Sequence, residues 1–446
     1  MKSAFVIAAP SSGSGKTTVT LSIMAALRKR GIKVQPFKTG PDYIDTAHHA
    51  LVTGMKGENL DTWMLPRQVN EDIFSRAMGS AEVGVVEGVM GLYDGVDGKR
   101  DTGSTASLAA LLGLPVILVV DARSMARSAA AIVSGFVNFS KELNFAGVIW
   151  NRVGSPNHLK ILDEALASAN LPHSLGAYGR RDDIAIPSRH LGLVTPEDMN
   201  FGDSFLTGLS TLAEESVDID KLLASTNFIV TPRENRENPT PRLRVAVPRD
   251  RAYSFYYEEN LRQIESLGGE LLFFAPTEGD ALPPGVDAVY LGGGYPELHA
   301  EKISANKGFI EGLRNLHRGG KPIYGECGGF MTMCEEVEDP SGRRWPMAGI
   351  FPTRAKMTER GFRLGYREVD GKPGTKLAGI TARGHEFHYS KIEAMPEDVK
   401  RVLKVKNARG EVLEEEGFTV GSASGGYIHL AFGSNPEIAK RLLGLG

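Results

Sequence analysis

Two sets of residues in this sequence have types and spacings that suit chemistry. The first is a loop near the N-terminus, Ser12-Gly13-Ser14-Gly15-Lys16-Thr17-Thr18. In a phosphate-binding loop, backbone N–H groups surround the phosphates, the lysine reaches the outer phosphates and the hydroxyl binds Mg²⁺. The second is Cys327, which stands among glycines, with His429 about a hundred residues further on. The sequence predicts nucleotide chemistry at the first site and thiol chemistry at the second.

The surroundings of the loop match those of a phosphate-binding loop. An apolar stretch, Ala4–Ala8, predicts a strand before the loop, and a helix is expected from about Lys16 to Arg30. A phosphate-binding loop needs this strand and this helix. The first glycine position of the motif holds Pro10, which is a departure from the standard pattern. The alternative is a flexible loop that contains Gly-Lys-Thr by chance.

Charged residues follow the next two predicted strands, where open α/β sheets bind their ligands. The carboxylates are Asp42, Asp45, Glu87 and Asp94. Asp45 and Glu87 are predicted to bind Mg²⁺ together with the Thr17 hydroxyl, since Mg²⁺ prefers oxygen ligands. Asp42 and Asp94 are candidates for substrate contacts, and equally for turn or cap residues. Lys38 is expected to steady phosphate or carboxylate charge.

The setting of Cys327 predicts a nucleophile. Gly325, Gly328 and Gly329 allow a sharp strand-to-helix turn that projects the side chain. The N-terminus of a following helix is expected to lower the pKa of the thiol. The alternative is a buried cysteine that acts as a small apolar residue, and Cys334 fits that description.

A thiol nucleophile needs a base and donors for an oxyanion. His429 is the predicted base, within an expected strand at 427–432, and His385 and His388 are its competitors. Backbone N–H groups near Gly293 and Gly328 are the predicted oxyanion donors. A plain tight turn is the alternative for the glycine run at 292–294.

The order of apolar runs predicts an α/β protein with two domains. The expected strands of the first half are Ala4–Ala8, Lys33–Phe37, Val83–Val86, Val116–Val120 and Ala146–Trp150. Continuous apolar runs of this kind are typical of parallel strands buried on both faces, so a doubly wound domain is predicted. A second set of strands begins at Leu243–Val247. Residues 231–241 carry three prolines and dense charge, which is typical of a linker. The predicted domains are therefore 1–230 and 242–446.

Composition limits the function classes. The 446 residues are 41% hydrophobic and 24% charged, with a net charge of −3. This balance gives no electrostatic case for binding nucleic acid or an anionic membrane. The chain has two cysteines and no apolar run long enough to cross a bilayer, so reduced thiols and a cytoplasmic location are expected.

Six motifs, in order along nearly the whole chain, resemble those of the cobyrinic acid a,c-diamide synthases. They are Gly40–Asp45, Glu87–Asp94, Arg189–Leu193, Phe255–Tyr257, Gly292–Glu297 and Gly325–Gly329. Hydrogenobyrinate and nickel-sirohydrochlorin a,c-diamide synthases are close relatives with the same motifs. The resemblance implies an N-terminal domain like dethiobiotin synthetase and a C-terminal glutamine amidotransferase domain of the class I type.

The resemblance also implies roles for residues. It assigns ATP and Mg²⁺ to Lys16, Thr17, Asp45 and Glu87, and glutamine cleavage to Cys327 and His429. Arg189 and His190 are expected to contact either nucleotide or tetrapyrrole. Most class I amidotransferases have a glutamate two residues after the histidine, where this chain has Ala431. The third member of the catalytic triad is therefore left open.

The expected reaction is the ATP- and glutamine-dependent amidation of the a and c acetate groups of cobyrinic acid through acyl phosphates. Cys327 would release ammonia from glutamine, and no partner beyond these small molecules is required, although a homodimer is an option. Two rivals remain. One is a partner-binding switch ATPase of the partitioning type, which usually carries a lysine where this chain has Ser11. The other is a phosphate-loop enzyme whose amidotransferase domain is degenerate.

Overall fold

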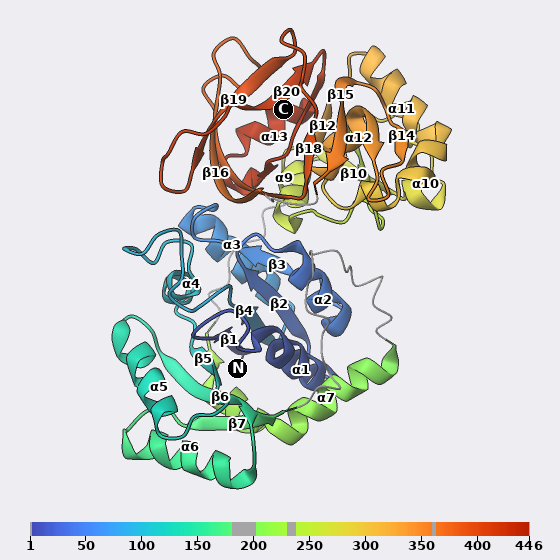
Figure 1. The fold of residues 1–446 in the computed structure, drawn as a ribbon. Helices are drawn as coiled ribbons and strands as arrows, with labels where there is room; N and C mark the ends of the chain where they lie inside the picture. Colours follow the sequence, from blue (N-terminus) through green and yellow to red (C-terminus); the bar gives the residue numbers. More distant parts are fainter. Residues whose placement is uncertain (1, 181–201, 230–237, 359–362, 446) are drawn as a thin grey trace. The chain divides into compact units, whose positions relative to one another are not determined.

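The computed structural model describes residues 2–180, 202–229, 238–358 and 363–445 (Figure 1). The chain divides into two compact units, Met1–Asn235 and Arg236–Gly446. Residues 231–237 of the predicted linker lie outside the described residues.

The first unit alternates strands and helices. Its strands are β1 (Lys2–Ala8), β2 (Val34–Thr39), β3 (Glu58–Leu60), β4 (Val83–Glu87), β5 (Val116–Asp121), β6 (Phe145–Val153), β7 (Ser174–Gly179) and β8 (Asn227–Phe228). Its helices are α1 (Lys16–Lys29), α2 (Tyr43–Thr53), α3 (Arg67–Met78), α4 (Thr105–Leu112), α5 (Ser128–Phe139), α6 (Pro156–Ser168), α7 (Asp203–Ser216) and α8 (Ile219–Ser225).

The sheet of the first unit has the order β3-β2-β4-β1-β5-β6-β7, and all neighbours in this order are parallel. The short β8 pairs antiparallel with β1. The doubly wound domain and its five predicted strands are confirmed, while β3, β7 and β8 were not predicted. Strand β1 lies between β4 and β5, so the connection from β1 to β2 and the connection from β4 to β5 run in opposite directions along the sheet. Such a point is where an open sheet leaves a crevice for ligands.

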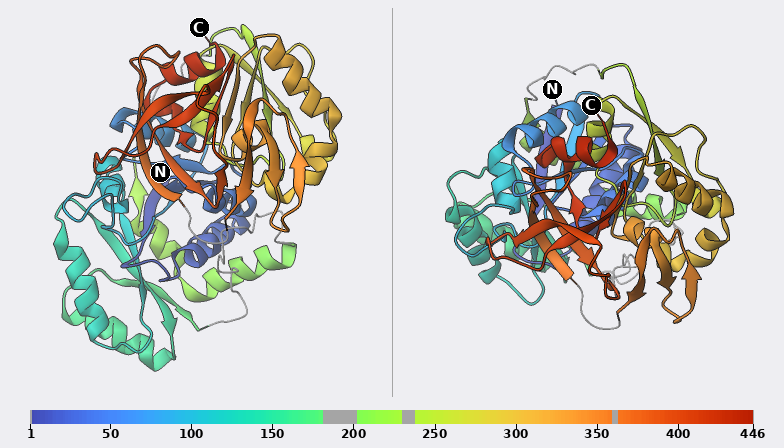
Figure 2. Two further views of the ribbon diagram at one scale, coloured as in Figure 1. Left: turned by 45° about the horizontal axis from the view of Figure 1, so that its top comes forward. Right: turned by 90° about the horizontal axis from the view of Figure 1, so that it is seen from above.

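Helices α1 and α7 pack on the strand that carries the phosphate loop. One buried cluster joins Phe5 and Ile7 of β1 to Leu21 of α1 and Leu209 of α7. The helices of this unit lie on both sides of its sheet (Figure 2). Each fully buried large apolar side chain contributes about 1.5–3 kcal/mol. The loop between β1 and α1 is therefore held at both ends by rigid elements.

The second unit contains more strands than helices. Its strands are β9 (Leu243–Pro248), β10 (Gly269–Phe274), β11 (Ala288–Leu291), β12 (Ile323–Glu326), β13 (Cys334–Glu338), β14 (Arg344–Pro346), β15 (Phe351–Met357), β16 (Arg363–Gly371), β17 (Thr381–His388), β18 (Ser390–Ile392), β19 (Lys400–Asn407), β20 (Glu416–Val420), β21 (Ala423–Gly426) and β22 (His429–Leu430). Its α-helices are α9 (Glu258–Ser266), α10 (Ala300–Ala305), α11 (Lys307–Arg318), α12 (Gly328–Met333) and α13 (Glu437–Leu443), and its 3₁₀ turns are η1 (Pro276–Glu278), η2 (Pro296–Leu298) and η3 (Phe432–Ser434).

The larger sheet of the second unit has the order β10-β9-β11-β12-β21-β20-β19-β16-β17-β22. It is parallel from β10 to β21 and antiparallel from there on. A separate sheet has the order β14-β13-β15-β18. The strand predicted at 427–432 is wrong in length, because β22 covers only His429–Leu430 and η3 follows it.

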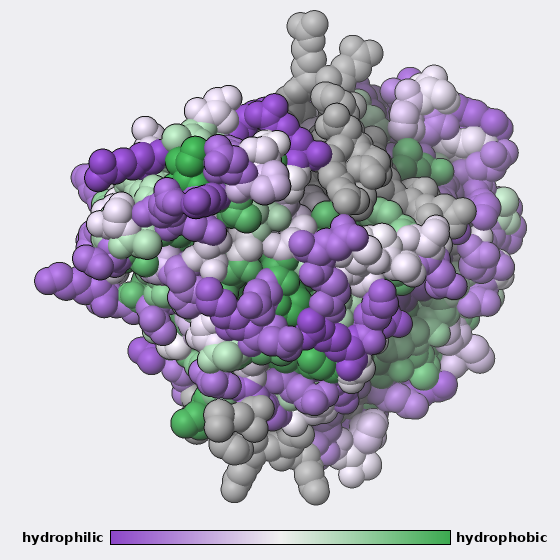
Figure 3. Space-filling model, turned by 90° about the horizontal axis from the view of Figure 1, so that it is seen from below, coloured by the Kyte–Doolittle hydropathy of each residue, from purple (hydrophilic) through white to green (hydrophobic). Residues whose placement is uncertain are grey.

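Some large apolar side chains are exposed on the surface. Phe139 is 71% exposed and Val412 is 78% exposed. Figure 3 shows hydrophobic residues (green) interspersed with hydrophilic ones (purple) on one face of the molecule. Isolated apolar side chains on a surface are normal. No helix within the described ranges is both long and apolar enough to cross a membrane.

Candidate active site

The predicted phosphate loop connects the end of β1 to the start of α1. Gly13 and Gly15 have φ values of +78° and +94°, which L side chains rarely adopt. A Cβ atom on Gly15 would lie 2.1 Å from Nδ2 of Asn151. That amide donates a hydrogen bond of 2.9 Å to the carbonyl of Ser14, within the loop. Asn151 follows the buried part of β6, and the sequence alone did not identify it.

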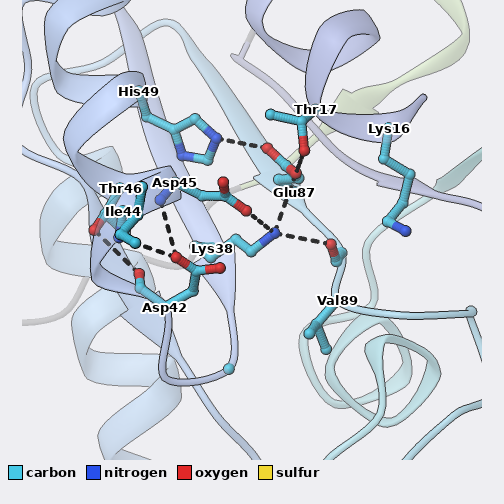
Figure 4. Close-up of polar contacts among 12 residues, drawn as sticks. Lys16, Thr17, Lys38, Asp42, Ile44, Asp45, Thr46, His49, Glu87 and Val89 are labelled. Carbon is cyan, nitrogen blue, oxygen red and sulfur yellow. Dashed lines mark hydrogen bonds and ion pairs between the residues drawn. The ribbon is translucent and has the colours of Figure 1, made fainter. Parts of the chain in front are cut away.

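Lys38 stands at the centre of a buried polar cluster beside the loop (Figure 4). Its Nζ lies 2.7 Å from Oδ2 of Asp45 and 3.1 Å from Oε1 of Glu87. Thr17 donates its hydroxyl proton to the same Oε1 at 2.6 Å. Parallel pairing of β2 and β4 sets Lys38 opposite Glu87, so strand register brings the two together.

Opposite charges decide the protonation of this cluster. Burial alone would lower the pKa of Lys38, but Asp45 and Glu87 outweigh it and raise that pKa well above its usual value. Burial would raise the pKa of Glu87, yet the positive charge of Lys38 and the contact with His49 hold it below its usual value. Lys38 is therefore an ammonium group and Glu87 a carboxylate at neutral pH.

Lys16, the first residue of α1, reaches toward the loop after β4. Its Nζ donates to the carbonyl of Met90 at 2.6 Å. Burial and the nearby charge of Lys38 lower the pKa of Lys16. Met90 has a φ of +49°, an unusual value for a residue other than glycine. The two lysines thus approach the end of β4 from different elements.

The predicted Mg²⁺ ligands suit that ion in type. Thr17, Asp45 and Glu87 offer a hydroxyl and two carboxylates, the hard oxygen donors that Mg²⁺ prefers. Oxygens from ATP and water would complete six ligands, as is usual at such sites. In the described part of the chain, no group of three or more His, Cys, Asp or Glu side chains is arranged to hold a metal by itself. Lys38 supplies the positive charge between the carboxylates in this structure.

Of the four residues predicted to contact substrate, the structure describes Asp42 and Asp94. Asp42 caps α2 by accepting from the N–H groups of Ile44 and Asp45, at 3.0 and 2.9 Å. Asp94 accepts from the N–H of Gly91 at 2.9 Å. Both carboxylates therefore have structural partners, and their contact with substrate stays a prediction. Arg189 and His190 lie outside the described residues.

His49 is a member of the cluster that sequence reasoning missed. It is fully buried on α2, and its Nε2 lies 2.7 Å from Oε2 of Glu87. One turn of helix separates it from Asp45, and residues four apart share a helix face. The spacing of four residues between Asp45 and His49 is the feature of the sequence that could have identified His49. His49 thus fixes the second oxygen of Glu87, while Thr17 and Lys38 contact the first.

In the second unit, Cys327 lies at a sharp turn between β12 and α12. Its φ of +48° is in the region that L residues rarely occupy. Its N–H donates to the carbonyl of Gly426 at 2.8 Å. A Cβ atom on Gly329 would lie 2.1 Å from the carbonyl oxygen of Leu291, so the turn requires glycine there. The predicted strand-to-helix turn is confirmed.

The structure brings His429 to the same place. Gly426, which accepts the bond from Cys327, ends β21 three residues before His429. A Cβ atom on Gly293 would lie 2.4 Å from Cε1 of His429. A Cβ atom on Gly328 would lie 3.1 Å from the backbone nitrogen of Gly294. The glycine loop therefore contacts both the histidine and the backbone next to the cysteine.

The expected effect of the helix on the thiol is wrong for this structure. Burial, with Glu297 and Glu326 nearby, raises the pKa of Cys327, although the N–H of Gly328 acts in the opposite direction. Helix α12 has six residues, so its dipole is small. The resting side chain is a thiol, and a base must remove its proton before it can attack.

Of the competing histidines, His385 lies beside His429 and His388 does not. The rings of His385 and His429 stack with centroids 4.8 Å apart, and the two residues pair across β17 and β22. Burial lowers the pKa of His385 to about 3 and that of His429 well below its usual value, so both rings are neutral. His388 is bonded to Glu386, at 2.8 Å, and to the carbonyl of Ser390.

Replacing Gly293 by alanine is expected to lower glutamine hydrolysis by about 100-fold, because a displacement of about 1 Å at a reacting group has effects of this size. The new methyl group would overlap the ring of His429. Glutamate release by the purified variant measures the loss. Gly208→Ala on α7 is the control, since its Cβ would meet nothing within 4 Å. Equal activity of both variants would contradict the placement of His429.

Comparisons with known proteins match both units of the chain. Residues 5–194 match the CobQ/CobB/MinD/ParA nucleotide binding domain, and residues 244–437 match the CobB/CobQ-like glutamine amidotransferase domain. The cobyrinate a,c-diamide synthase of Dehalococcoides mccartyi strain CBDB1 is 39% identical, over 98% of this chain and 97% of its own. That of Listeria innocua is 40% identical over 99% of both chains, and that of Listeria monocytogenes EGD-e is 41% identical over 98% of both. The resemblance of the motifs is confirmed, and the chain belongs to the cobyrinate a,c-diamide synthase family.

Proposed function

We propose that this protein catalyses the ATP- and glutamine-dependent amidation of the a and c acetate carboxylates of cobyrinic acid, a step of cobalamin biosynthesis. The observation that carries the proposal is the match to the named synthases over at least 98% of the chain, across both sites. A partner-binding switch ATPase would leave the cysteine site without a purpose. The strained turn at Cys327 and its buried histidine also speak against a degenerate second domain.

The second unit releases ammonia in this scheme. His429 takes the proton of the Cys327 thiol, and the sulfur attacks the side-chain amide of glutamine. Backbone N–H groups near Gly293 and Gly328 are the proposed donors to the oxyanion. Collapse of the tetrahedral intermediate, with a proton returned from His429, gives ammonia and a thioester. Water then releases glutamate and restores the thiol.

The first unit activates the carboxylate. ATP is proposed to bind along the loop Ser12–Thr18, with Lys16 against its outer phosphates. A substrate carboxylate attacks the γ-phosphorus in line and becomes an acyl phosphate. Ammonia then displaces the phosphate and forms the amide. Lys38, held as an ammonium by its two carboxylates, would balance the negative charge of the phosphate or of the attacking carboxylate.

Magnesium is the proposed metal of this step. Thr17, Asp45 and Glu87 would hold Mg²⁺, which stabilises the charge that develops on the transferred phosphoryl group. For that to occur, the ammonium of Lys38 must leave its position between the two carboxylates.

The test is mass spectrometry of the tetrapyrrole after incubation with enzyme, ATP, Mg²⁺ and glutamine. Cobyrinic acid, hydrogenobyrinic acid and nickel-sirohydrochlorin are offered in parallel. Two successive conversions of a carboxyl to an amide on cobyrinic acid are expected. If only another macrocycle is converted, the reaction is as proposed but that macrocycle, and not cobyrinic acid, is the substrate. ATP hydrolysis with no amide on any of the three would contradict the proposal.

A further inference from the structure

Glu326 precedes the candidate nucleophile in the sequence and lies beside the candidate base in the structure. It ends β12 directly before Cys327, and its side chain is 1% exposed. Its Oε2 lies 3.9 Å from Nδ1 of His429, whose side chain is equally buried. The chain has Ala431 where most class I amidotransferases carry the glutamate that supports the catalytic histidine. Glu326 is a carboxylate that this structure places next to that histidine, and the charge of Glu386 on β17 also acts on the ring.

Three donors fix the carboxylate of Glu326. The hydroxyl of Tyr290 on β11 donates to Oε2 at 2.9 Å, and that of Tyr324 on β12 donates to Oε1 at 2.8 Å. The N–H of Leu430 donates to Oε1 at 3.0 Å. Leu430 directly follows His429 on β22, so this bond ties the carboxylate to the backbone of the base. The arrangement fixes both the position of the carboxylate and its distance to the ring.

We propose that Glu326 is a positioning residue for the glutaminase step: its carboxylate keeps the proton of neutral His429 on Nδ1 and stabilises the imidazolium formed when Nε2 takes the Cys327 proton. The inference rests on the proposed function. No other proton moves in this step: the thiol becomes a thiolate, the imidazole becomes an imidazolium, and the carboxylate keeps its charge. The distance of 3.9 Å is too long for a hydrogen bond, and because His429 is neutral in the free protein the two groups form an ion pair only once the ring is protonated. Catalytic hydrogen bonds often shorten only once substrate is bound.

Only the ionised form of Glu326 can stabilise the imidazolium of His429. Burial raises its pKa to about 7, against the three donors, which lower it. Activity that depends on this charge is therefore present above about pH 7 and is lost as pH falls through that value. His429 and His385, which faces it from β17, have pKa values held low by burial and remain neutral over this range. The pKa of Cys327 is raised, so ionisation of the thiol changes the activity only at alkaline pH.

The test compares wild type with Glu326→Gln and Tyr324→Phe. Glutamate release and the alkylation rate of Cys327 by iodoacetamide are both followed against pH. Glu326→Gln is expected to lower both rates by about 100-fold at neutral pH, as the loss of a supporting carboxylate does elsewhere. It should also remove the inflection near pH 7. Tyr324→Phe keeps the carboxylate but removes one donor to it, so the inflection should move to higher pH.

Two further measurements separate the role of Glu326 from that of other buried carboxylates and from the proposed function. Glu416→Gln removes another buried carboxylate of this unit, whose pKa burial raises to about 8, and it should leave the inflection in place. An unchanged pH profile in both Glu326→Gln and Tyr324→Phe would overturn the inference. Ammonia-dependent amidation by wild type tests the proposed function separately, because it needs no glutamine hydrolysis. Its absence with all three macrocycles would refute that function while the thiol measurements still stand.

Discussion

Replacing Cys327 by alanine is expected to abolish the use of glutamine while amidation with free ammonia continues. The thiol is the nucleophile of the proposed thioester, and loss of a catalytic nucleophile lowers turnover by about 10⁴-fold or more. The other thiol, Cys334, is fully buried within the core and bonded to the carbonyl of Phe330, so it offers no substitute. The measurement is amide formation by mass spectrometry with glutamine or with ammonium as the nitrogen source.

Cys334→Ala is the matched control for that experiment. Its side chain lies seven residues along the chain in the same unit, away from the strained turn at Cys327. It is expected to keep both nitrogen sources in use. Loss of both activities together in Cys327→Ala, with the variant still folded, would contradict a scheme with two separate sites.

Replacing Glu87 by glutamine is expected to reduce amidation by about 1000-fold with either nitrogen source, while glutamine hydrolysis continues. The change removes the carboxylate charge that balances Lys38 and that is proposed to bind Mg²⁺. Loss of roughly 4 kcal/mol of charge stabilisation in the transition state corresponds to this factor. ATP hydrolysis and amide formation, titrated with Mg²⁺, measure the effect, and a requirement for more Mg²⁺ is expected.

Glu214→Gln serves as the control for Glu87→Gln. Glu214 pairs with Arg30 at 2.6 Å on the surface of the same unit, and such exposed pairs contribute little. Thermal unfolding of both variants is measured as well, because Glu87→Gln removes one of the two carboxylates that pair with the buried ammonium of Lys38 and leaves Asp45. Full amidation activity in a folded Glu87→Gln protein would exclude the proposed metal site.

Local patterns in the sequence were sufficient to predict five of the parallel strands in the first unit, and the positions of the phosphate loop and of the turn at Cys327. Runs such as Val83–Val86 are apolar at every position because strands in a doubly wound sheet are covered on both faces. The glycines around Cys327 indicated its turn because only a residue without a side chain fits so close to neighbouring backbone. The antiparallel strands β16, β19 and β20 were not predicted. Their side chains are only partly buried and carry weaker patterns.

The sequence by itself determined which residue types can bind phosphate and attack an amide, since those properties belong to short segments. Only the tertiary structure decided which other side chains these residues contact. Parallel register sets Lys38 beside Glu87, and helix α2 turns His49 toward the same carboxylate. Pairing of separate strands brings Glu326 to His429 across a hundred residues of sequence. Burial then reverses the expected effect on the thiol pKa of Cys327, because desolvation depends on everything packed around a group and not on its neighbours in sequence.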